Sequence, residues 1–271
     1  MNLPFIKPLP EVEIAINAAL KAGKEILKMY TLDFKINYKG INDPVTEADM
    51  KSNDIITAML NITGFPILSE EGSDKKSYLG HDCFWIVDPL DGTKNFIGKD
   101  GQFSVMIGLV KDCLVVLGIV YQPTTGDLFM AQKGSGAYEK TADGWKKLMV
   151  NNENLIEDCT AVMSKNHISD RDLNILKDLH VSKITHKGSG GLKVGEICRG
   201  NADIYFNSSN KQKLWDTCAS YCIISEAGGK MTDMLGNPFD YCSEKLVHEN
   251  GVLVTNFKFH DLIVKKHSML K

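Results

Sequence analysis

A short apolar run that leads directly into two aspartates constrains this chain more than any other feature. Residues 84–87 are Phe-Trp-Ile-Val, and they are followed by Asp88-Pro89-Leu90-Asp91-Gly92-Thr93. The proline fixes the backbone between the two carboxylates, and the glycine permits a tight turn behind them. We therefore expect a buried strand that directs Asp88, Asp91 and the Leu90 carbonyl at one point at the end of a sheet.

This arrangement has two interpretations. Two carboxylates that are held close together repel each other, and a hard divalent cation relieves the repulsion. Magnesium prefers oxygen ligands of this kind and keeps some of its waters. Alternatively, Asp88 and Asp91 merely cap backbone amides in a turn. Residues 85–93 alone favour neither a magnesium site nor a turn.

Three other acidic positions allow a similar choice. Glu70-Glu71 follows the apolar pair at 67–68, and Trp215-Asp216 opens a predicted helix, where the helix dipole suits a carboxylate. Thr46 and Asp49 have the spacing of a capping box. Taken alone, a solvated loop explains Glu70, an N-cap explains Asp216, and the capping box explains Asp49.

The apolar pattern predicts an α+β front half and an α/β back half. We place the boundary between residues 1–152 and residues 153–271. Helical periodicity and helix signals predict helices at 11–30, from 46 to about 63, and at 171–180, 192–198 and 216–227. Short apolar runs and turn signals predict strands at 84–87, 103–110, 114–121, 127–131, 161–163, 202–206 and 251–255.

Charge, hydropathy and cysteine content narrow the class of protein. The formal net charge is −3, whereas a general binder of nucleic-acid polymers has a basic excess. The sequence contains no apolar run long enough to span a bilayer. The cysteines number seven, which is odd, and most lie in apolar runs, so we expect reduced, buried thiols in a cytoplasmic protein. The sequence does not indicate an oligomeric state.

The ordered set of acidic motifs resembles the lithium-sensitive, magnesium-dependent phosphomonoesterases. These include inositol monophosphatases and 3′(2′),5′-bisphosphate nucleotidases (PAP phosphatases). The similarity extends from about residue 42 to residue 255. It implies a layered αβαβα fold and two or three magnesium ions. The implied metal ligands are Glu70, Asp88, the Leu90 carbonyl, Asp91 and Asp216.

The resemblance also implies the catalytic residues, which are Asp49, Thr93 and Glu70. Thr93, with Asp49 hydrogen-bonded to it, would orient and deprotonate the attacking water. The implied substrate contacts are Asp91, Gly92, Thr93, Ser164, His167, Gly190, Lys193 and Asp216.

Three segments resemble the nucleotidase branch: DPLDGTKNF at 88–96, Ser164-Lys165-Asn166-His167, and the glycine-rich turn at 188–193. Ser164 would contact phosphate or ribose, His167 would stack near the adenine, and Lys193 would reach a second phosphate. Without the resemblance, His167 is an ordinary surface histidine, and glycine turns before helices are common.

Two positions depart from that branch. Glycines occupy 190 and 191, where serines are expected, and Asn207 stands where microbial and plant members carry an arginine for the phosphate that is not cleaved. Residues 211–219 are closer to animal-type members, which also accept inositol 1,4-bisphosphate. Lys213 could supply the missing charge, although a solvated surface lysine is the more ordinary explanation.

The expected reaction is magnesium-dependent hydrolysis of adenosine 3′,5′-bisphosphate to AMP and phosphate, with 3′-phosphoadenylyl sulfate as a further substrate. One alternative is an inositol phosphate phosphatase that acts on inositol 1,4-bisphosphate or inositol monophosphate. Two others are a catalytically silent nucleotide-binding protein and an α/β protein whose acidic turns have no function.

Overall fold

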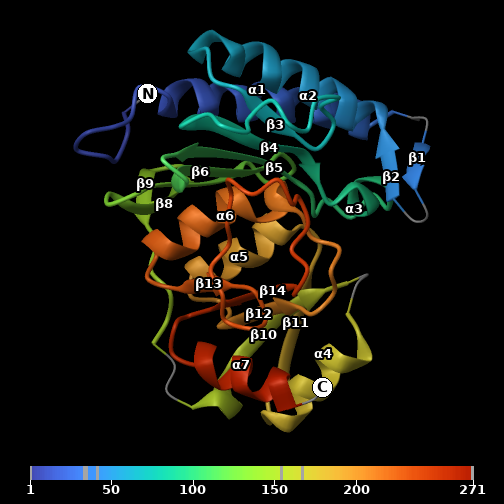
Figure 1. Ribbon diagram of the computed structural model, residues 1–271, viewed down its shortest axis with the longest axis vertical. Coiled ribbons are helices and arrows are strands. Elements are labelled where there is room, and N and C mark those ends of the chain that lie inside the picture. Colours follow the sequence, from blue (N-terminus) through green and yellow to red (C-terminus); the bar gives the residue numbers. More distant parts are fainter. Residues whose placement is uncertain (1, 33–35, 41–42, 153–154, 166–167, 270–271) are drawn as a thin grey trace.

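A computed structural model describes residues 2–32, 36–40, 43–152, 155–165 and 168–269. Helices and sheets alternate in five layers, as Figure 1 shows. From the top of the figure, these layers are α1 (Val12–Tyr30) and α2 (Glu47–Leu60), a seven-stranded sheet, α5 (Gly190–Cys198) and α6 (Leu214–Glu226), a five-stranded sheet, and α4 (Asp170–Asp178) with α7 (His260–Met269). The arrangement confirms the predicted αβαβα fold.

The seven-stranded sheet has its strands in sequence order, from β3 to β9. Its strands are β3 (Ile67–Ser69), β4 (Cys83–Asp91), β5 (Ser104–Lys111), β6 (Leu114–Gln122), β7 (Asp127–Gln132), β8 (Gly136–Thr141) and β9 (Gly144–Lys147). Phe84 and Ile86 of β4 pack into the core on one face, and Trp85 and Val87 into the core on the other. Burial on both faces explains why the strand is continuously apolar.

Helix α6 crosses this sheet at a pair of facing glycines. Gly108 of β5 and Gly118 of β6 are register partners. A Cβ atom at Gly118 would lie 2.1 Å from the Ala219 carbonyl oxygen, and one at Gly108 would lie 2.4 Å from Cys218 Sγ. The absence of side chains there lets the helix approach the strands closely, which fixes the depth at which its first turn lies.

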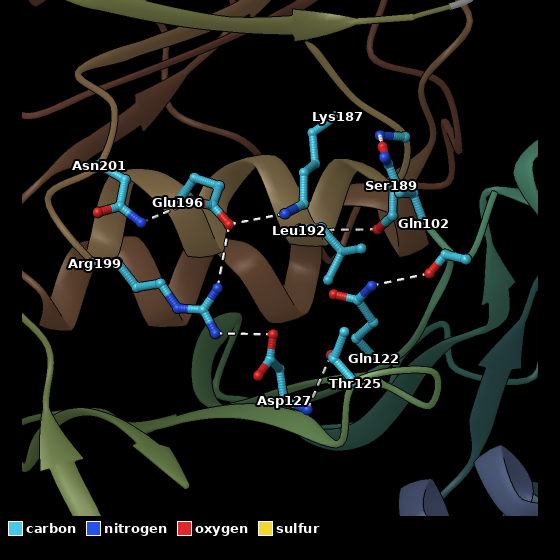
Figure 2. Close-up of polar contacts among 12 residues, drawn as sticks. Gln102, Gln122, Thr125, Asp127, Lys187, Ser189, Leu192, Glu196, Arg199 and Asn201 are labelled. Carbon is cyan, nitrogen blue, oxygen red and sulfur yellow. Dashed lines mark hydrogen bonds and ion pairs between the residues drawn. The ribbon is translucent and has the colours of Figure 1, made fainter. Parts of the chain in front are cut away.

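An ion-pair cluster joins helix α5 to the same sheet (Figure 2). Arg199, at the C-terminal end of α5, contacts Asp127 of β7 at 2.9 Å and Glu196 at 3.2 Å. It also pairs with Glu139 of β8 and lies 4.6 Å from the centre of the Phe129 ring. These contacts hold the C-terminal end of the helix on the strands, while its N-terminal end faces the cavity described below.

The five-stranded sheet has the order β11-β10-β12-β14-β13. Its strands are β10 (Thr160–Ser164), β11 (Lys183–Lys187), β12 (Ile204–Asn207), β13 (Lys230–Thr232) and β14 (Val252–Thr255). A separate hairpin is formed by β1 (Ile36–Gly40) and β2 (Asp43–Thr46), which leads into α2. The domain boundary placed after residue 152 stays a prediction; it falls in the sequence between these two larger sheets. Among the described residues, no helix has the length and apolar character needed to span a membrane.

The predicted helices and strands are confirmed in type, with shifts at their ends. Strand β12 begins at Ile204 rather than at 202, because Ile204 is the first residue that pairs with a residue of β14, Thr255. Helix α6 begins at Leu214, so Lys213 is its N-cap and the N-cap interpretation of Asp216 is wrong. The sequence analysis missed elements with little apolar periodicity: β8, β9, β11, β13, the hairpin of β1 and β2, and α7. A short helix, α3 (Thr93–Ile97), begins at Thr93.

The prediction of reduced thiols is wrong for two cysteines. Cys113 and Cys242 form a disulfide across a sequence separation of 129 residues. Cys113 lies in the turn between β5 and β6, and Cys242 lies between β13 and β14. The sequence could not predict this pair, because the fold alone brings the two positions together. The other cysteines are free, and four of them are buried.

Candidate active site

A cavity of about 620 Å³ lies where the end of β4 meets the beginnings of α3, α5 and α6. Ten of the residues predicted from the resemblance take part in its wall. They are Glu70, Asp88, Leu90, Asp91, Gly92, Thr93, Ser164, Gly190, Lys193 and Asp216. The structure therefore brings together segments that are separated by up to 146 residues along the chain (Glu70 to Asp216).

Three carboxylates converge at one end of this cavity. Glu70, Asp88 and Asp216 each offer an oxygen atom, and these atoms all lie within 4.8 Å of one another. Burial raises the pKa of Asp88 well above its usual value, and the charges of Glu70, Asp91 and Asp216 raise it further. Burial raises the pKa of Asp216 in the same way, followed by the charge of Glu70.

This cluster fits a divalent cation. Three buried or half-buried carboxylates this close together are costly to ionise, and a hard cation with oxygen ligands offsets that cost. Nearby backbone contacts hold two of the ligands in place: Asp88 Oδ1 accepts from the Leu90 amide at 3.0 Å, and Asp216 Oδ2 accepts from the Lys213 amide at 2.7 Å. A backbone amide therefore fixes one carboxylate oxygen of Asp88 and one of Asp216.

Asp91, the fourth predicted carboxylate, lies beside this cluster but is held by the beginning of α5. Its Oδ2 accepts hydrogen bonds from the Ser189 hydroxyl and, at 3.1 Å, from the Gly191 amide. Burial raises its pKa, and the Ser189 hydrogen bond opposes that effect. Asp91 therefore connects the β4 loop to α5, in addition to contributing its charge to the carboxylate cluster.

Ser189 contacts the predicted ligand Asp91, and the sequence analysis did not single it out. It is the N-cap of α5, where its hydroxyl accepts from the Leu192 amide at 3.2 Å, an interaction drawn in Figure 2. The same hydroxyl lies 2.8 Å from that of Ser104. A serine that precedes a helix is a typical cap; that signal was available in the sequence, but the contact with Asp91 was not.

Asp49 makes both contacts that the sequence analysis expected, one within the capping box and one with Thr93. Its Oδ2 accepts from the amide and hydroxyl of Thr46, at 2.8 Å and 2.6 Å, which completes the predicted capping box. Its Oδ1 accepts from the Thr93 hydroxyl at 2.9 Å. Burial raises the pKa of Asp49 to about 6. Asp49 is thus a buried carboxylate that is connected to the cavity through Thr93, which lines the wall.

Gly92 gives the loop its sharp turn. Its φ of 94° is in the left-handed region that favours glycine, and a Cβ atom there would lie 3.0 Å from the Gln102 carbonyl oxygen. Its carbonyl oxygen accepts from the amides of Asn95 and Phe96, which starts α3. The turn brings Thr93 to within hydrogen-bond distance of the Leu90 carbonyl, at 3.3 Å.

Lysines lie around the carboxylates. Lys94, Lys193, Lys211 and Lys213 all line the cavity. The Lys193 ammonium is buried and donates to the carbonyls of Gly188, at 2.6 Å, and Ser189, at 3.1 Å. Burial lowers its pKa to about 8, although the charges of Asp91 and Asp216 act against this. The cavity thus has an acidic end within a basic surrounding.

Not every predicted substrate contact can be placed. His167 lies outside the described residues, whereas Ser164, at the end of β10, lines the cavity. Asn207 lines it as well, and its Oδ1 accepts from the Ser209 amide at 2.9 Å. Cavity residues that were not predicted as substrate contacts include Tyr205, Gln212 and Trp215.

Known proteins resemble this chain over nearly its whole length. Residues 9–268 match the inositol monophosphatase family. The 3′(2′),5′-bisphosphate nucleotidase CysQ of Aggregatibacter actinomycetemcomitans is 32% identical over 252 residues, which cover 88% of this chain and 90% of that protein.

Solved structures resemble it as well. The crystal structure of CysQ from Bacteroides thetaiotaomicron, described as a bacterial member of the inositol monophosphatase family, has a TM-score of 0.77 at 31% identity and covers 92% of this chain and 98% of that one. The extragenic suppressor protein suhB from Bartonella henselae has a TM-score of 0.83 at 26% identity, with 94% and 97% covered. This chain is therefore a phosphomonoesterase of the inositol monophosphatase family.

Proposed function

We propose that this protein hydrolyses the 3′-phosphate of adenosine 3′,5′-bisphosphate to give AMP and phosphate, in a magnesium-dependent reaction. We include 3′-phosphoadenylyl sulfate as a second substrate, because it carries the same 3′-phosphate. One observation carries the proposal: the carboxylate cluster, several lysines and Thr93, which is hydrogen-bonded to Asp49, all line one cavity. The relatives named as 3′(2′),5′-bisphosphate nucleotidases support the choice of substrate.

The residues proposed to hold magnesium are Glu70, Asp88 and Asp216, together with Asp91 and the Leu90 carbonyl, which lie in the same cavity wall. Bound magnesium would neutralise charge on the phosphate and lower the pKa of the attacking water. Glu70 follows β3, Asp88 belongs to β4 and Asp216 to α6, and the fold brings their carboxylate oxygens within 4.8 Å of one another.

Thr93 and Asp49 form the proposed proton-accepting pair. The Thr93 hydroxyl donates its hydrogen to Asp49, so the lone pairs of that oxygen remain free to accept a hydrogen bond from a water in the cavity. Asp49 is anchored by Thr46 and is nearly buried, which fixes the orientation of Thr93. With a pKa of about 6, Asp49 is largely ionised at neutral pH and can draw the proton away from the attacking water through Thr93.

Size and charge favour a doubly phosphorylated, nucleotide-sized substrate. The cavity of about 620 Å³ is in the range of pockets that hold whole small molecules. Lys211 and Lys213, which lie on the segment between β12 and α6, provide positive charge in the wall. They could offset a second phosphate in place of the arginine that Asn207 replaces.

The test is a comparison of substrates with purified protein in magnesium. We expect kcat/KM to be highest for adenosine 3′,5′-bisphosphate and lower for 3′-AMP, which lacks the second phosphate. Asp91→Asn serves as the inactive control: we expect it to fold but to show no turnover, since it removes a charge at the proposed metal site. Release of phosphate from inositol 1-phosphate or inositol 1,4-bisphosphate, with none from the adenosine bisphosphate, would contradict the nucleotidase proposal and favour an inositol phosphate phosphatase.

A further inference from the structure

The three clustered carboxylates differ in how the chain supports them. Asp88 belongs to strand β4 and Asp216 to helix α6, so regular elements hold both. Glu70 directly follows β3, at the beginning of the connection to β4. The backbone amide of Glu70 donates to the Val87 carbonyl at 3.0 Å. Its carbonyl side is attached to a segment without regular structure.

Lys75 ties this segment back to Glu70. Its ammonium group donates to the carbonyl oxygens of Ser69 and Glu70, in each case at 2.6 Å. The same nitrogen lies 4.9 Å from the centre of the Trp215 ring. Trp215 is buried and immediately precedes Asp216. One ammonium therefore contacts the peptide groups at Glu70 and the side chain next to Asp216.

We infer that Lys75 is a positioning residue, which sets the separation between Glu70 and Asp216 and thereby the affinity of the site for magnesium. The inference rests on the metal-dependent function proposed above. Glu70 and Asp216 come from different halves of the chain, and no single strand or helix contains both and fixes their distance. Lys75 acts on the two ligands through the peptide carbonyls of Ser69 and Glu70 and through the indole of Trp215.

The chemistry of the contact suits a lysine. An ammonium has three N–H donors, and two of them are used on adjacent carbonyls. A cation above an indole face is attracted by the ring, and the attraction grows where water is excluded. A neutral side chain of the same length would lose both interactions and leave the two carbonyls without this donor.

The neighbouring lysine offers a matched control. Lys76 pairs with Glu244, and the side chains of both are largely exposed, so this pair contributes little to stability or to the site. Lys75→Met and Lys76→Met remove the same charge and introduce the same side chain at adjacent positions. Lys75→Arg keeps a cation that can donate to carbonyls and stack on an indole.

The experiment measures magnesium binding directly by isothermal titration calorimetry, and separately the magnesium concentration that gives half-maximal turnover. We expect Lys75→Met to weaken magnesium binding about 10- to 100-fold, the range seen when groups that orient metal ligands are removed. Lys76→Met should bind as the parent does, and Lys75→Arg should recover most of the loss. At saturating magnesium, kcat of Lys75→Met should stay near the parent value, because the reacting groups are unchanged.

Equal magnesium affinity in Lys75→Met and Lys76→Met would overturn the inference, even if Lys75→Met melts at a lower temperature without metal. If Lys75→Met does not fold, the comparison is made between Lys75→Gln and Lys75→Arg, and equal affinities of those two would overturn it as well. A parent protein that binds no magnesium would instead refute the proposed function.

Discussion

At the scale of single residues, Asp49 is the group whose two contacts can be separated experimentally. One carboxylate oxygen caps helix α2 through Thr46 and the other accepts from Thr93. We predict that Asp49→Asn lowers kcat about 10²- to 10⁴-fold, the usual contribution of a proton-accepting group. The loss of the cap should cost only about 1 kcal/mol of folding free energy. Steady-state turnover and thermal melting measure the two effects.

Asp172→Asn is the matched control for this variant. Asp172 occupies the same position in the capping box of α4, where its Oδ2 accepts from the Ser169 amide at 3.1 Å. It should lose a comparable amount of stability and keep turnover close to that of the parent. If the two variants lost activity equally, helix capping rather than the contact with Thr93 would explain the effect of Asp49→Asn.

The buried carboxylates also predict how stability depends on pH. The pKa values of Asp49, Asp88, Asp91 and Asp216 are raised in the folded protein, so the folded state binds protons more tightly than the unfolded state. Their contribution to stability is fully present below the unfolded pKa values, near 4, and is lost as pH rises through the folded values. We therefore expect the contribution of these four carboxylates to the stability of the metal-free protein to fall as pH rises above about 4.

Magnesium should reverse this trend, because it binds the ionised carboxylates. Its stabilising effect should be small at pH 5 and grow towards pH 8, reaching about 2.7 kcal/mol at a concentration 100 times the dissociation constant. Melting curves at a series of pH values, with magnesium and with a chelator, measure both trends. A magnesium effect that is independent of pH would argue against binding at these carboxylates.

The sequence alone was enough to single out the acidic residues of the candidate site, because each lies beside a strong local signal. Asp88 and Asp91 lie at the end of a buried strand, and Asp49 lies in a capping box. Lys75 and Ser189 carry no comparable signal for their contacts with the site: Lys75 reaches Trp215 from 140 positions away in the sequence, and Ser189 reaches Asp91 from 98. Contacts of this kind depend on tertiary packing, which a single sequence does not reveal.

At the scale of elements, the facing glycines under α6 determine where Asp216 lies. A Cβ atom at Gly118 would meet the backbone of Ala219, which is one turn after Asp216 on the same helix. Since backbone atoms cannot rotate away, Gly118→Ala should displace α6 and destabilise the protein by about 1–3 kcal/mol, as overpacked cores do. It should also weaken magnesium binding, as measured by calorimetry. A variant with parental stability and affinity would show that α6 tolerates the shift.

Elements were predictable where burial imposes a period. Helix α1 and strands β4, β5 and β6 are buried along one or both faces, and the apolar pattern located each of them. Strand β11 has four exposed residues out of five, and β9 has no buried residue, so neither has an apolar period to detect. Such strands form because a neighbouring strand provides hydrogen-bond partners.

At the scale of the whole molecule, the cavity depends on how a late segment of the chain packs against the first sheet. The segment between β13 and β14 pairs with the residues that enter α6: the Leu214 amide donates to the Leu246 carbonyl at 2.9 Å, and the His248 amide to the Gln212 carbonyl at 2.8 Å. Cys242 of this segment is bonded to Cys113 in the turn between β5 and β6. The disulfide therefore anchors one wall of the cavity to the sheet.

Reduction of this bond should lower stability more than activity. A cross-link that closes 129 residues restricts the unfolded chain, and the chain-entropy estimate for a loop of that size is about 5 kcal/mol, an upper limit. We expect a dithiol to lower the melting temperature of the parent and to leave Cys242→Ser unchanged, with the variant melting near the reduced parent. Thiol titration of the unfolded parent should find five reactive cysteines before reduction and seven after, because two of the seven are bonded. Seven reactive thiols before reduction would mean that the bond does not form, and that hydrogen bonds such as those at Gln212 and Leu214 hold this wall of the cavity without it.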